Sequence, residues 1–310
     1  MAYGTSSSGG NDAAPPANRI GSFAMTTGHS SSRLSARLTG ALEKFAGFAP
    51  WRDALAAGEK VFFRCNICGG ACAAPMSGLS RETSSCRRCG STVRMRTIVH
   101  LLTAELFGRS IALPNLPLRR DVAGIGLSDT PAYADRLAQK LGYTNTFFHC
   151  EPRLDIGAAS IQLSARYDFI IASDVFEHVA PPVSRAFANA RRLLKPHGVF
   201  IFSVPYTLEP ETREHFPELH DYKLVESGGA WRLENRTVDG RAQVYTDLVF
   251  HGGPGSTLEM RLFSRSGLIR EFAEAGFAGV RIADEPHLDH GIVWPEPWSV
   301  PMVAYATLDR

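Results

Sequence analysis

The 310-residue sequence contains no long hydrophobic run and almost no excess charge. No segment approaches the roughly 20 apolar residues of a membrane-spanning helix, and the amino-terminal region lacks the apolar core of a secretory signal. With 33 basic and 31 acidic residues, the net charge of +2 gives no strong field for attracting nucleic acid. We therefore expect a soluble, cytoplasmic protein without a membrane span.

Large apolar side chains are also scarce in residues 1–32, which are rich in Ser, Gly, Ala, Thr and Pro. Such a composition buries too little apolar surface to offset the entropy of ordering, so a disordered tail is predicted. An amphipathic targeting peptide is the alternative, because the segment contains few acidic residues. Residues 33–59 have the pattern of one or two short helices that lead into the next element.

Two closely spaced cysteine pairs follow, separated by 17 residues. They are CNICGG, with Cys65 and Cys68, and CRRCGS, with Cys86 and Cys89. This spacing is typical of a four-thiolate structural zinc site, and the glycine after each pair lets backbone amides face the thiolates. Thiols persist in a reducing compartment, so we prefer a zinc-ribbon-like module over 60–92 to disulfides or free thiols. Cys72 is then a spare cysteine, and Cys150 is expected to be a small buried residue in a strand.

Five arginines lie around the cysteine pairs: Arg81, Arg87, Arg88, Arg94 and Arg96. Because a closed tetrahedral site has no open position for a substrate, the module would contribute stability and recognition but no chemistry. The arginines could contact phosphates or an acidic substrate, but no aromatic residues are interleaved with them to stack on bases. We therefore expect them to form a solvated surface. Residues 93–118 begin with a helical pattern and are predicted to link the module to the following domain.

The most informative segment spans residues 167–206, YDFIIASDVFEHVAPPVSRAFANARRLLKPHGVFIFSVPY. Its first apolar run lacks alternation, which predicts a strand covered on both faces, as in a parallel sheet. The pattern from 182 to 195 predicts an amphipathic crossover helix, which Pro196 and Gly198 end before a second apolar strand. Ligands of open α/β sheets bind at the carboxyl ends of the strands, so we expect chemistry after the first run. The polar residues there are Ser173, Asp174, Glu177 and His178.

This segment resembles class I S-adenosylmethionine-dependent methyltransferases with a Rossmann-like fold. The similar pieces are YDFIIASDVFEHV, RLLKPHGVFIFSVP and, near the carboxyl end, RLFSRSGLIREFAEAGFAGVRI. They occur in the family's order, and the resemblance covers about residues 119–205 and 260–310. It implies an α/β domain over 119–310 with a mostly parallel sheet, an antiparallel carboxyl-terminal edge and S-adenosylmethionine as cofactor.

The resemblance also implies where the cofactor's glycine-rich loop lies. The corresponding stretch is DVAGIGLSD, with Gly124 and Gly126 in a turn after the first strand, where bare backbone can approach a ligand closely. Two positions depart from the family pattern, since Val122 replaces an acid and Ser128 replaces a third glycine. Asp129 stands beside the second departure and is expected to compensate for it. Cofactor contacts are therefore expected from Gly124, Gly126, Ser128 and Asp129.

The remaining cofactor contacts are expected at the ends of the next two strands. A predicted strand over 146–150 ends at Glu151, whose carboxylate would accept hydrogen bonds from the ribose hydroxyls. Asp155 is the alternative acid, because the interval before the strand at 167 is short and one helix is expected to be missing. Ser173 and Asp174 would line the floor beneath the methionine part of the cofactor.

On the acceptor side, His178 is the candidate general base, because imidazole titrates near neutral pH. Asp174 is the second candidate catalytic residue. The alternative is that Glu177 and His178 only cap the following turn. An insertion over 207–259 is expected to cover the acceptor, with a hairpin turn at Asp239–Gly240. Its substrate-side candidates are His215, His220, Tyr222 and Trp231. The stretch HFPELHD could also bind a metal, although its spacing fixes no geometry.

Together these features predict transfer of a methyl group from S-adenosylmethionine to a small-molecule or glycan-linked acceptor. The first alternative is an RNA base methyltransferase whose cysteine module binds RNA. The second is a non-catalytic binding protein, because the glycine loop departs from the family pattern. Nothing in the sequence indicates the oligomeric state.

Overall fold

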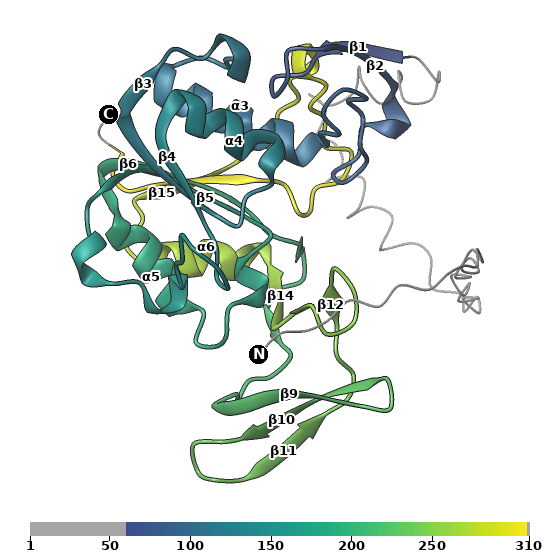
Figure 1. The fold of residues 1–310 in the computed structure, drawn as a ribbon, viewed down its shortest axis with the longest axis vertical. Coiled ribbons are helices and arrows are strands. Elements are labelled where there is room, and N and C mark those ends of the chain that lie inside the picture. Colours follow the sequence, from purple (N-terminus) through teal and green to yellow (C-terminus); the bar gives the residue numbers. More distant parts are fainter. Residues whose placement is uncertain (1–59, 309–310) are drawn as a thin grey trace, which may run out of the picture. The chain divides into compact units, whose positions relative to one another are not determined.

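The computed structural model describes residues 60–308, and its centre is a six-stranded, mostly parallel sheet (Figure 1). The spatial order is β15–β16–β6–β5–β3–β4. The bounds are β3 (Arg119–Leu127), β4 (Leu141–Thr146), β5 (Tyr167–Ser173), β6 (Leu194–Ser203), β15 (Gly279–Ile282) and β16 (Met302–Tyr305). Strands β4, β3, β5 and β6 are parallel, whereas β16 is antiparallel to β6 and β15 to β16. The predicted sheet with an antiparallel carboxyl-terminal edge is thus confirmed. The tail and lead-in predicted over 1–59 lie outside the described residues.

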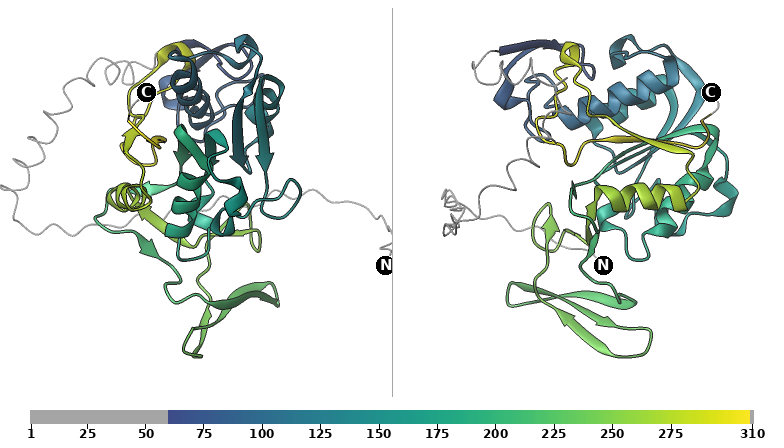
Figure 2. Two further views of the ribbon diagram at one scale, coloured as in Figure 1. Left: turned by 90° about the vertical axis from the view of Figure 1, so that its left-hand side faces the viewer. Right: turned by 180° about the vertical axis from the view of Figure 1, so that it is seen from behind.

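Four helices cover the two faces of this sheet. They are α3 (Val93–Phe107), α4 (Pro131–Lys140), α5 (Ser184–Leu193) and α6 (Arg265–Glu274). Helices α3 and α4 lie on one face, and α5 and α6 on the other (Figures 1 and 2). Three of them begin at a hydroxyl side chain that accepts a hydrogen bond from the first turn, namely Thr92, Thr130 and Ser264. No helix within 60–308 is long and apolar enough to cross a membrane.

Aromatic side chains form the centre of the core between the sheet and helices α5 and α6. Phe200 and Phe202 of β6, Phe187 of α5 and Phe272 of α6 are almost completely buried. The ring centroids of Phe187 and Phe272 are 5.0 Å apart, and those of Phe202 and Phe272 are 5.2 Å apart, both nearly perpendicular. Edge-to-face pairs of this kind add to the stabilisation from apolar burial. They hold the crossover helix firmly against β5 and β6.

Strand β4 lies earlier in the chain than predicted. The predicted strand over 146–150 is wrong: β4 directly follows α4, and Leu141, Tyr143 and Thr146 turn their side chains into the core. Consequently Cys150 is exposed, in contrast to the predicted buried position. Between β4 and β5 the chain forms only two short 3₁₀ turns, Ile156–Ala158 and Ile161–Leu163. The expected loss of one helix in this interval is confirmed.

The glycines of the predicted loop lie inside β3 and not in a turn after it. Their side-chain space is filled by the protein, because an added Cβ at Gly124 would overlap the Phe169 ring and one at Gly126 would overlap the Tyr143 hydroxyl. These two rings are parallel, with centroids 5.9 Å apart. The two glycines therefore allow neighbouring aromatic side chains to pack against the strand.

The cysteine module contains a hairpin of β1 (Lys60–Arg64) and β2 (Ala71–Pro75) and continues into α3. Arg96 of α3 is completely buried beneath the module. Its guanidinium donates to the carbonyls of Ser91, His290 and Gly291 and lies 4.7 Å from the centre of the Phe63 ring. It therefore joins the module to the carboxyl-terminal part of the chain. The expectation that Arg96 is solvated is wrong.

The insertion contains a small antiparallel sheet of β9 (Asp221–Ser227), β10 (Ala230–Arg236) and β11 (Ala242–Tyr245). The predicted hairpin turn at Asp239–Gly240 is confirmed, with Gly240 at φ +86°. A separate apolar cluster of Phe216, Leu233, Leu258 and Met260 packs beside this sheet. The chain returns through β12 (Phe250–His251), β13 (Thr257–Leu258) and β14 (Arg261–Ser264).

Replacing Gly124 by Ala should destabilise the fold by about 1–3 kcal/mol, because the added methyl group overlaps the Phe169 ring. Chemical denaturation measures the change in the free energy of unfolding. Combining Gly124→Ala with Phe169→Leu should cost less than the sum of the two single substitutions, since the smaller side chain leaves room. Strictly additive costs would show that the ring does not occupy this space.

Candidate active site at the ends of the parallel strands

A cavity of about 890 Å³ lies at the carboxyl ends of β3, β4 and β5. Leu127 and Ser128 line it at the end of β3, residues 146–150 at the end of β4, and Asp174 and Val175 at the end of β5. The opposite wall comes from the insertion and includes Tyr222, His251 and Leu258. The structure therefore brings together the strand ends and the insertion, as the sequence predicts for a ligand site.

The residues directly after β3 and β5 have unusual backbone conformations. Ser128 has φ +57° and Asp174 has φ +56°, although neither is glycine. Each amide is held by the neighbouring strand: Ser128 donates to the Thr146 carbonyl at 2.7 Å and Asp174 to the Ser203 carbonyl at 2.8 Å. Such left-handed positions are costly and occur often at functional sites. Here they turn the chain sharply at the floor of the cavity.

Asp129 does not line the cavity, although it is a predicted cofactor contact. It is 3% exposed, and its two carboxylate oxygens accept hydrogen bonds from Tyr133 at 2.7 Å and Tyr143 at 2.6 Å. Burial raises the pKa of Asp129 to about 7, and the two tyrosine hydrogen bonds only partly oppose this shift. The carboxyl group therefore fixes the segment between β3 and α4 from inside.

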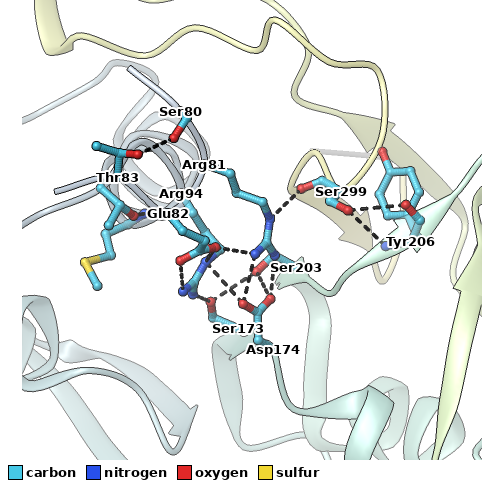
Figure 3. A network of polar contacts seen from close by, with 12 residues as sticks. Ser80, Arg81, Glu82, Thr83, Arg94, Ser173, Asp174, Ser203, Tyr206 and Ser299 are labelled. Carbon is cyan, nitrogen blue, oxygen red and sulfur yellow. Dashed lines mark hydrogen bonds and ion pairs between the residues drawn. The ribbon is translucent and has the colours of Figure 1, made fainter. Parts of the chain in front are cut away.

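Asp174 is held by Arg81 of the cysteine module and by Arg94 at the start of α3 (Figure 3). Arg81 donates to both of its oxygens, at 2.6 and 3.1 Å, and Nε of Arg94 lies 3.2 Å from Oδ2. Arg94 also forms hydrogen bonds with Glu82 at 2.7 and 2.8 Å and contacts the Ser173 hydroxyl. Because its oxygens are occupied by cations, Asp174 is an anchoring anion in this arrangement and not a free base.

The sequence predicted a solvated surface for these arginines, and the structure differs. The Arg81 and Arg94 side chains are only 19% and 14% exposed, and Arg96 is fully buried. Arg87 and Arg88 alone among the five are exposed. Residues 81 and 174 are 93 positions apart, so no local pattern could have indicated this contact. The sequence marks Asp174 as a polar residue at the end of β5 but gives no sign of its arginine partners.

Of the two candidate acids after β4, only one lines the cavity. Glu151 is exposed, does not line the cavity, and accepts a hydrogen bond from the Arg153 amide at 3.0 Å. Asp155 lines the cavity and accepts from the Gly157 amide at 2.8 Å. The shift of β4 toward the amino terminus explains this result, since Glu151 follows an irregular segment and not a strand end.

His178 lies on the cavity wall and belongs to a chain of polar contacts. Its Nδ1 donates to the Leu258 carbonyl at 2.9 Å, and its Nε2 is 3.1 Å from Nδ1 of His251. Nε2 of His251 is 3.0 Å from Glu259, whose other oxygen is 2.8 Å from His215. Burial lowers the pKa of His178, so the imidazole is neutral near pH 7.

The alternative that Glu177 only caps the following turn is wrong. Its side chain is 1% exposed, and neither carboxylate oxygen has a hydrogen-bond partner. Burial, together with the nearby negative charge of Asp174, raises the pKa of Glu177 well above its ordinary value. Its nearest polar neighbour on the acceptor side is His178, with Oε1 and Nε2 3.7 Å apart.

The substrate-side candidates of the insertion occupy different positions. Tyr222 lines the cavity. His215 lies behind the wall, bonded to Glu259, and Trp231 packs against the Phe250 ring with centroids 6.0 Å apart. His220 is exposed and does not line the cavity. His251 and Glu259 were missed, because a single His and a single Glu in an insertion have no recognisable spacing.

The four paired cysteines converge in the module. The sulfur atoms of Cys65 and Cys89 are 3.7 Å apart, and those of Cys68 and Cys86 are 3.6 Å apart. All four lie within 4.8 Å of one another, and Cys72 is not one of them. The glycine after each pair has positive φ, and the amides of Gly69 and Gly90 donate to the carbonyls of Cys65 and Cys86 at 2.8 Å. Both turns thus have the same conformation.

A family profile described as "Methyltransferase domain" matches residues 121–282, just over half of the chain. The chain belongs to this methyltransferase family. The match spans β3 to β15, and with it the cavity floor, so the Rossmann-like sheet described above is a methyltransferase sheet. A search of curated proteins finds no match.

Solved structures of methyltransferases are similar to this one. The 1,6-didemethyltoxoflavin-N1-methyltransferase of Burkholderia thailandensis, with bound S-adenosylhomocysteine, is 15% identical over 69% of this chain and 78% of its own, with a TM-score of 0.38. The sugar N-methyltransferase KedS8 from Streptoalloteichus is 11% identical over 71% and 89%, with a TM-score of 0.39. The amino pentose methyltransferase CalS10 from Micromonospora echinaspora is 15% identical over 67% and 91%, with a TM-score of 0.35.

Asp129 should make the stability of this methyltransferase fall as the pH rises from about 4 to 7. Over this range the folded state keeps the proton that the unfolded state has lost, since the folded pKa is about 7 and the ordinary value is 3.8. Denaturant unfolding at several pH values should show a loss on the order of a few kcal/mol. Asp129→Asn should remove this loss. If the free energy of unfolding of the variant still fell with pH as steeply as that of the wild type, Asp129 would not be the group responsible.

The Arg81 and Asp174 side chains should show coupled stability. Because both are partly buried, Arg81→Gln should cost about 1–2 kcal/mol, with Arg87→Gln as an exposed control of negligible cost. A double-mutant cycle with Asp174→Asn should give an interaction energy of at least about 1 kcal/mol. A value near zero would mean that this ion pair does not hold the module in place.

Proposed function

We propose that this methyltransferase binds S-adenosylmethionine at the carboxyl ends of β3, β4 and β5 and methylates a small-molecule or glycan-linked acceptor. The observation that carries the proposal is the continuous cavity, which joins these strand ends to the His178–His251 pair and the insertion. Its volume of about 890 Å³ is near the upper end of the range for small-molecule sites, roughly 300–1,000 Å³. Such a cavity has room for a donor and an acceptor side by side.

Asp155 is the residue that we assign to the ribose of the cofactor. It is the acid after β4 that lines the cavity, and the neighbouring lining residues Phe147, Leu154 and Ile156 are apolar. An apolar wall beside one carboxylate suits a nucleoside, whose base is flat and whose ribose carries two hydroxyl donors. Ser128, on the cavity floor at the end of β3, offers exposed backbone to the rest of the cofactor.

His178 is the residue that we assign to the acceptor. When bound, S-adenosylmethionine supplies a methyl group that its sulfonium already makes electrophilic. The protein therefore has mainly to align the acceptor and provide for the loss of its proton. Asp174 is engaged by Arg81 and Arg94, whereas His178 is neutral and faces the cavity. Tyr222, on the insertion, would contact the far side of the acceptor.

The cysteine cluster fits a structural zinc ion. Four sulfurs at about 2.3 Å from a central ion in tetrahedral geometry are about 3.8 Å apart, which agrees with the 3.6 and 3.7 Å separations within the cluster. The assigned ligands are Cys65, Cys68, Cys86 and Cys89. Four protein ligands leave no open position, so the ion would stabilise the module that carries Arg81 and leads directly into α3 with Arg94.

The alternative of an RNA substrate loses most of its support. Of the five arginines that could have contacted phosphates, three form internal contacts, and only Arg87 and Arg88 remain exposed. Two exposed arginines make a small patch compared with the extended basic surfaces of RNA-binding proteins. A small-molecule acceptor within the cavity accounts better for the arrangement.

Calorimetric titration with S-adenosylhomocysteine tests the cofactor site. Asp155→Asn should weaken binding at least about tenfold, because the charge that accepts from the ribose hydroxyls is lost while the amide oxygen can still accept from Gly157. Glu151→Gln is the matched control and should bind like the wild type. Weaker binding by the control than by Asp155→Asn would reverse the assignment, and no binding by the wild type would end the proposal.

A further inference from the structure

The imidazoles of His178 and His251 meet in a way that requires a positive charge between them. His178 follows β5, and His251 lies on β12 in the insertion. Nε2 of His178 is 3.1 Å from Nδ1 of His251, and the ring planes are nearly perpendicular. Both rings line the cavity. The contact therefore lies where the acceptor is expected.

The other ring nitrogens decide where the protons are. Nδ1 of His178 faces the Leu258 carbonyl, which can only accept, so this nitrogen carries the hydrogen. Nε2 of His251 faces the Glu259 carboxylate and carries the hydrogen for the same reason. In the neutral rings the two facing nitrogens are then both lone pairs. Two lone pairs at 3.1 Å repel each other unless a proton or a metal ion lies between them.

A buried carboxylate without a partner completes the cluster. Glu177 is 1% exposed, and neither of its oxygens forms a hydrogen bond. Leaving such a group unpaired is costly, so buried carboxylates normally bind cations or donors. One oxygen of Glu177 and one ring nitrogen each of His178 and His251 all lie within 4.8 Å of one another, and Oε1 of Glu177 is 3.7 Å from Nε2 of His178. Apart from the four cysteines, these are the sole such group found among residues 60–308.

We propose that Glu177, His178 and His251 bind a divalent transition-metal ion that holds an oxygen group of the acceptor. The inference rests on the proposed function for the acceptor, but the metal site itself does not. Two nitrogens bound at about 2.0–2.1 Å to one ion can be at most about 4 Å apart, and the observed 3.1 Å satisfies this limit. Two imidazoles with one carboxylate favour ions such as Zn²⁺, Mn²⁺, Fe²⁺ or Co²⁺ over Ca²⁺.

The surroundings of the two histidines match those of metal-bound imidazoles. Such rings usually donate their second N–H to a carbonyl or a carboxylate, which fixes the tautomer and orients the ring. His178 donates to the Leu258 carbonyl and His251 to Glu259. Glu259 is itself held by His215 at 2.8 Å. This arrangement gives His215 a positioning role, although it does not line the cavity.

Three protein ligands leave coordination positions open toward the cavity. An acceptor hydroxyl bound there would have a lowered pKa and would release its proton to solvent water. The resulting oxygen anion attacks the methyl carbon of S-adenosylmethionine, and the electrons of the broken C–S bond remain on sulfur. The products are a methyl ether and S-adenosylhomocysteine, with one proton released. His178 is a metal ligand in this scheme, and the acceptor class is a hydroxylated compound.

Titration of metal-free protein with Co²⁺ tests the site. The wild type should bind two Co²⁺ per chain, one with the charge-transfer absorption of cysteine thiolates and one without it. His251→Ala and Glu177→Gln should each bind one Co²⁺ and keep the thiolate absorption. His220→Ala, which changes an exposed histidine outside the cavity, should still bind two. One Co²⁺ per wild-type chain, or two in both site variants, would overturn the proposal.

Two further measurements keep this outcome interpretable. Glu177→Gln preserves the shape of the side chain, so it serves as the site variant if His251→Ala does not fold. S-adenosylhomocysteine binding is measured separately, because that ligand occupies the strand ends and not the histidine pair. If the wild type binds S-adenosylhomocysteine but only one Co²⁺, a shared proton occupies the pair and the metal proposal fails while the proposed function stands. If the wild type binds two Co²⁺ but no S-adenosylhomocysteine, the proposed function fails while the metal site stands.

Discussion

The ion pairs of Asp174 with Arg81 and Arg94 connect the amino-terminal part of the described chain to the floor of the cavity. Asp174 follows β5 at the cavity floor, whereas Arg81 belongs to the cysteine module and Arg94 to the first turn of α3, directly after the module. Each charge is partly removed from water, so the interaction is stable only when all three groups are in place. The cysteine cluster, the ends of the parallel strands and the cavity thus depend on one another. Arg81 thus joins the module directly to a residue of the cavity floor.

Neighbouring side chains fill the space beside the two glycines of β3 and hold the segment that follows. Phe169 and Tyr143 pack where side chains on β3 would otherwise lie, and the Tyr143 hydroxyl joins that of Tyr133 in holding Asp129. Ser128 keeps the left-handed conformation in which a glycine is usually found. The segment between β3 and α4 is therefore fixed by the backbone at Ser128 and by the contacts of Asp129.

Local patterns predicted the parts of the fold whose signals lie close together in the chain. The β5–α5–β6 unit and the turn at Asp239–Gly240 were predicted because hydrophobic period and turn residues determine them within a few residues. The position of β4 was missed because it follows α4 directly, with no turn residues between them to mark where the strand begins. From that error followed the preference for Glu151.

Contacts between distant segments could not be predicted. The partners of Asp174 lie 80 and 93 residues before it, and the partner of His178 lies 73 residues after it. Burial of Arg96 likewise depends on carbonyls almost 200 residues away. Such pairings arise from packing of whole elements, and a single sequence carries no record of them.

Strand β13 links the apolar cluster of the insertion to the orientation of the His178 imidazole. The Leu258 side chain belongs to the apolar cluster beside the insertion, while its carbonyl accepts the hydrogen bond from His178. A substitution that repacks this cluster and displaces Leu258 is therefore expected to shift the carbonyl that holds the ring. Packing within the insertion and the orientation of His178 on the cavity wall are linked through this one residue.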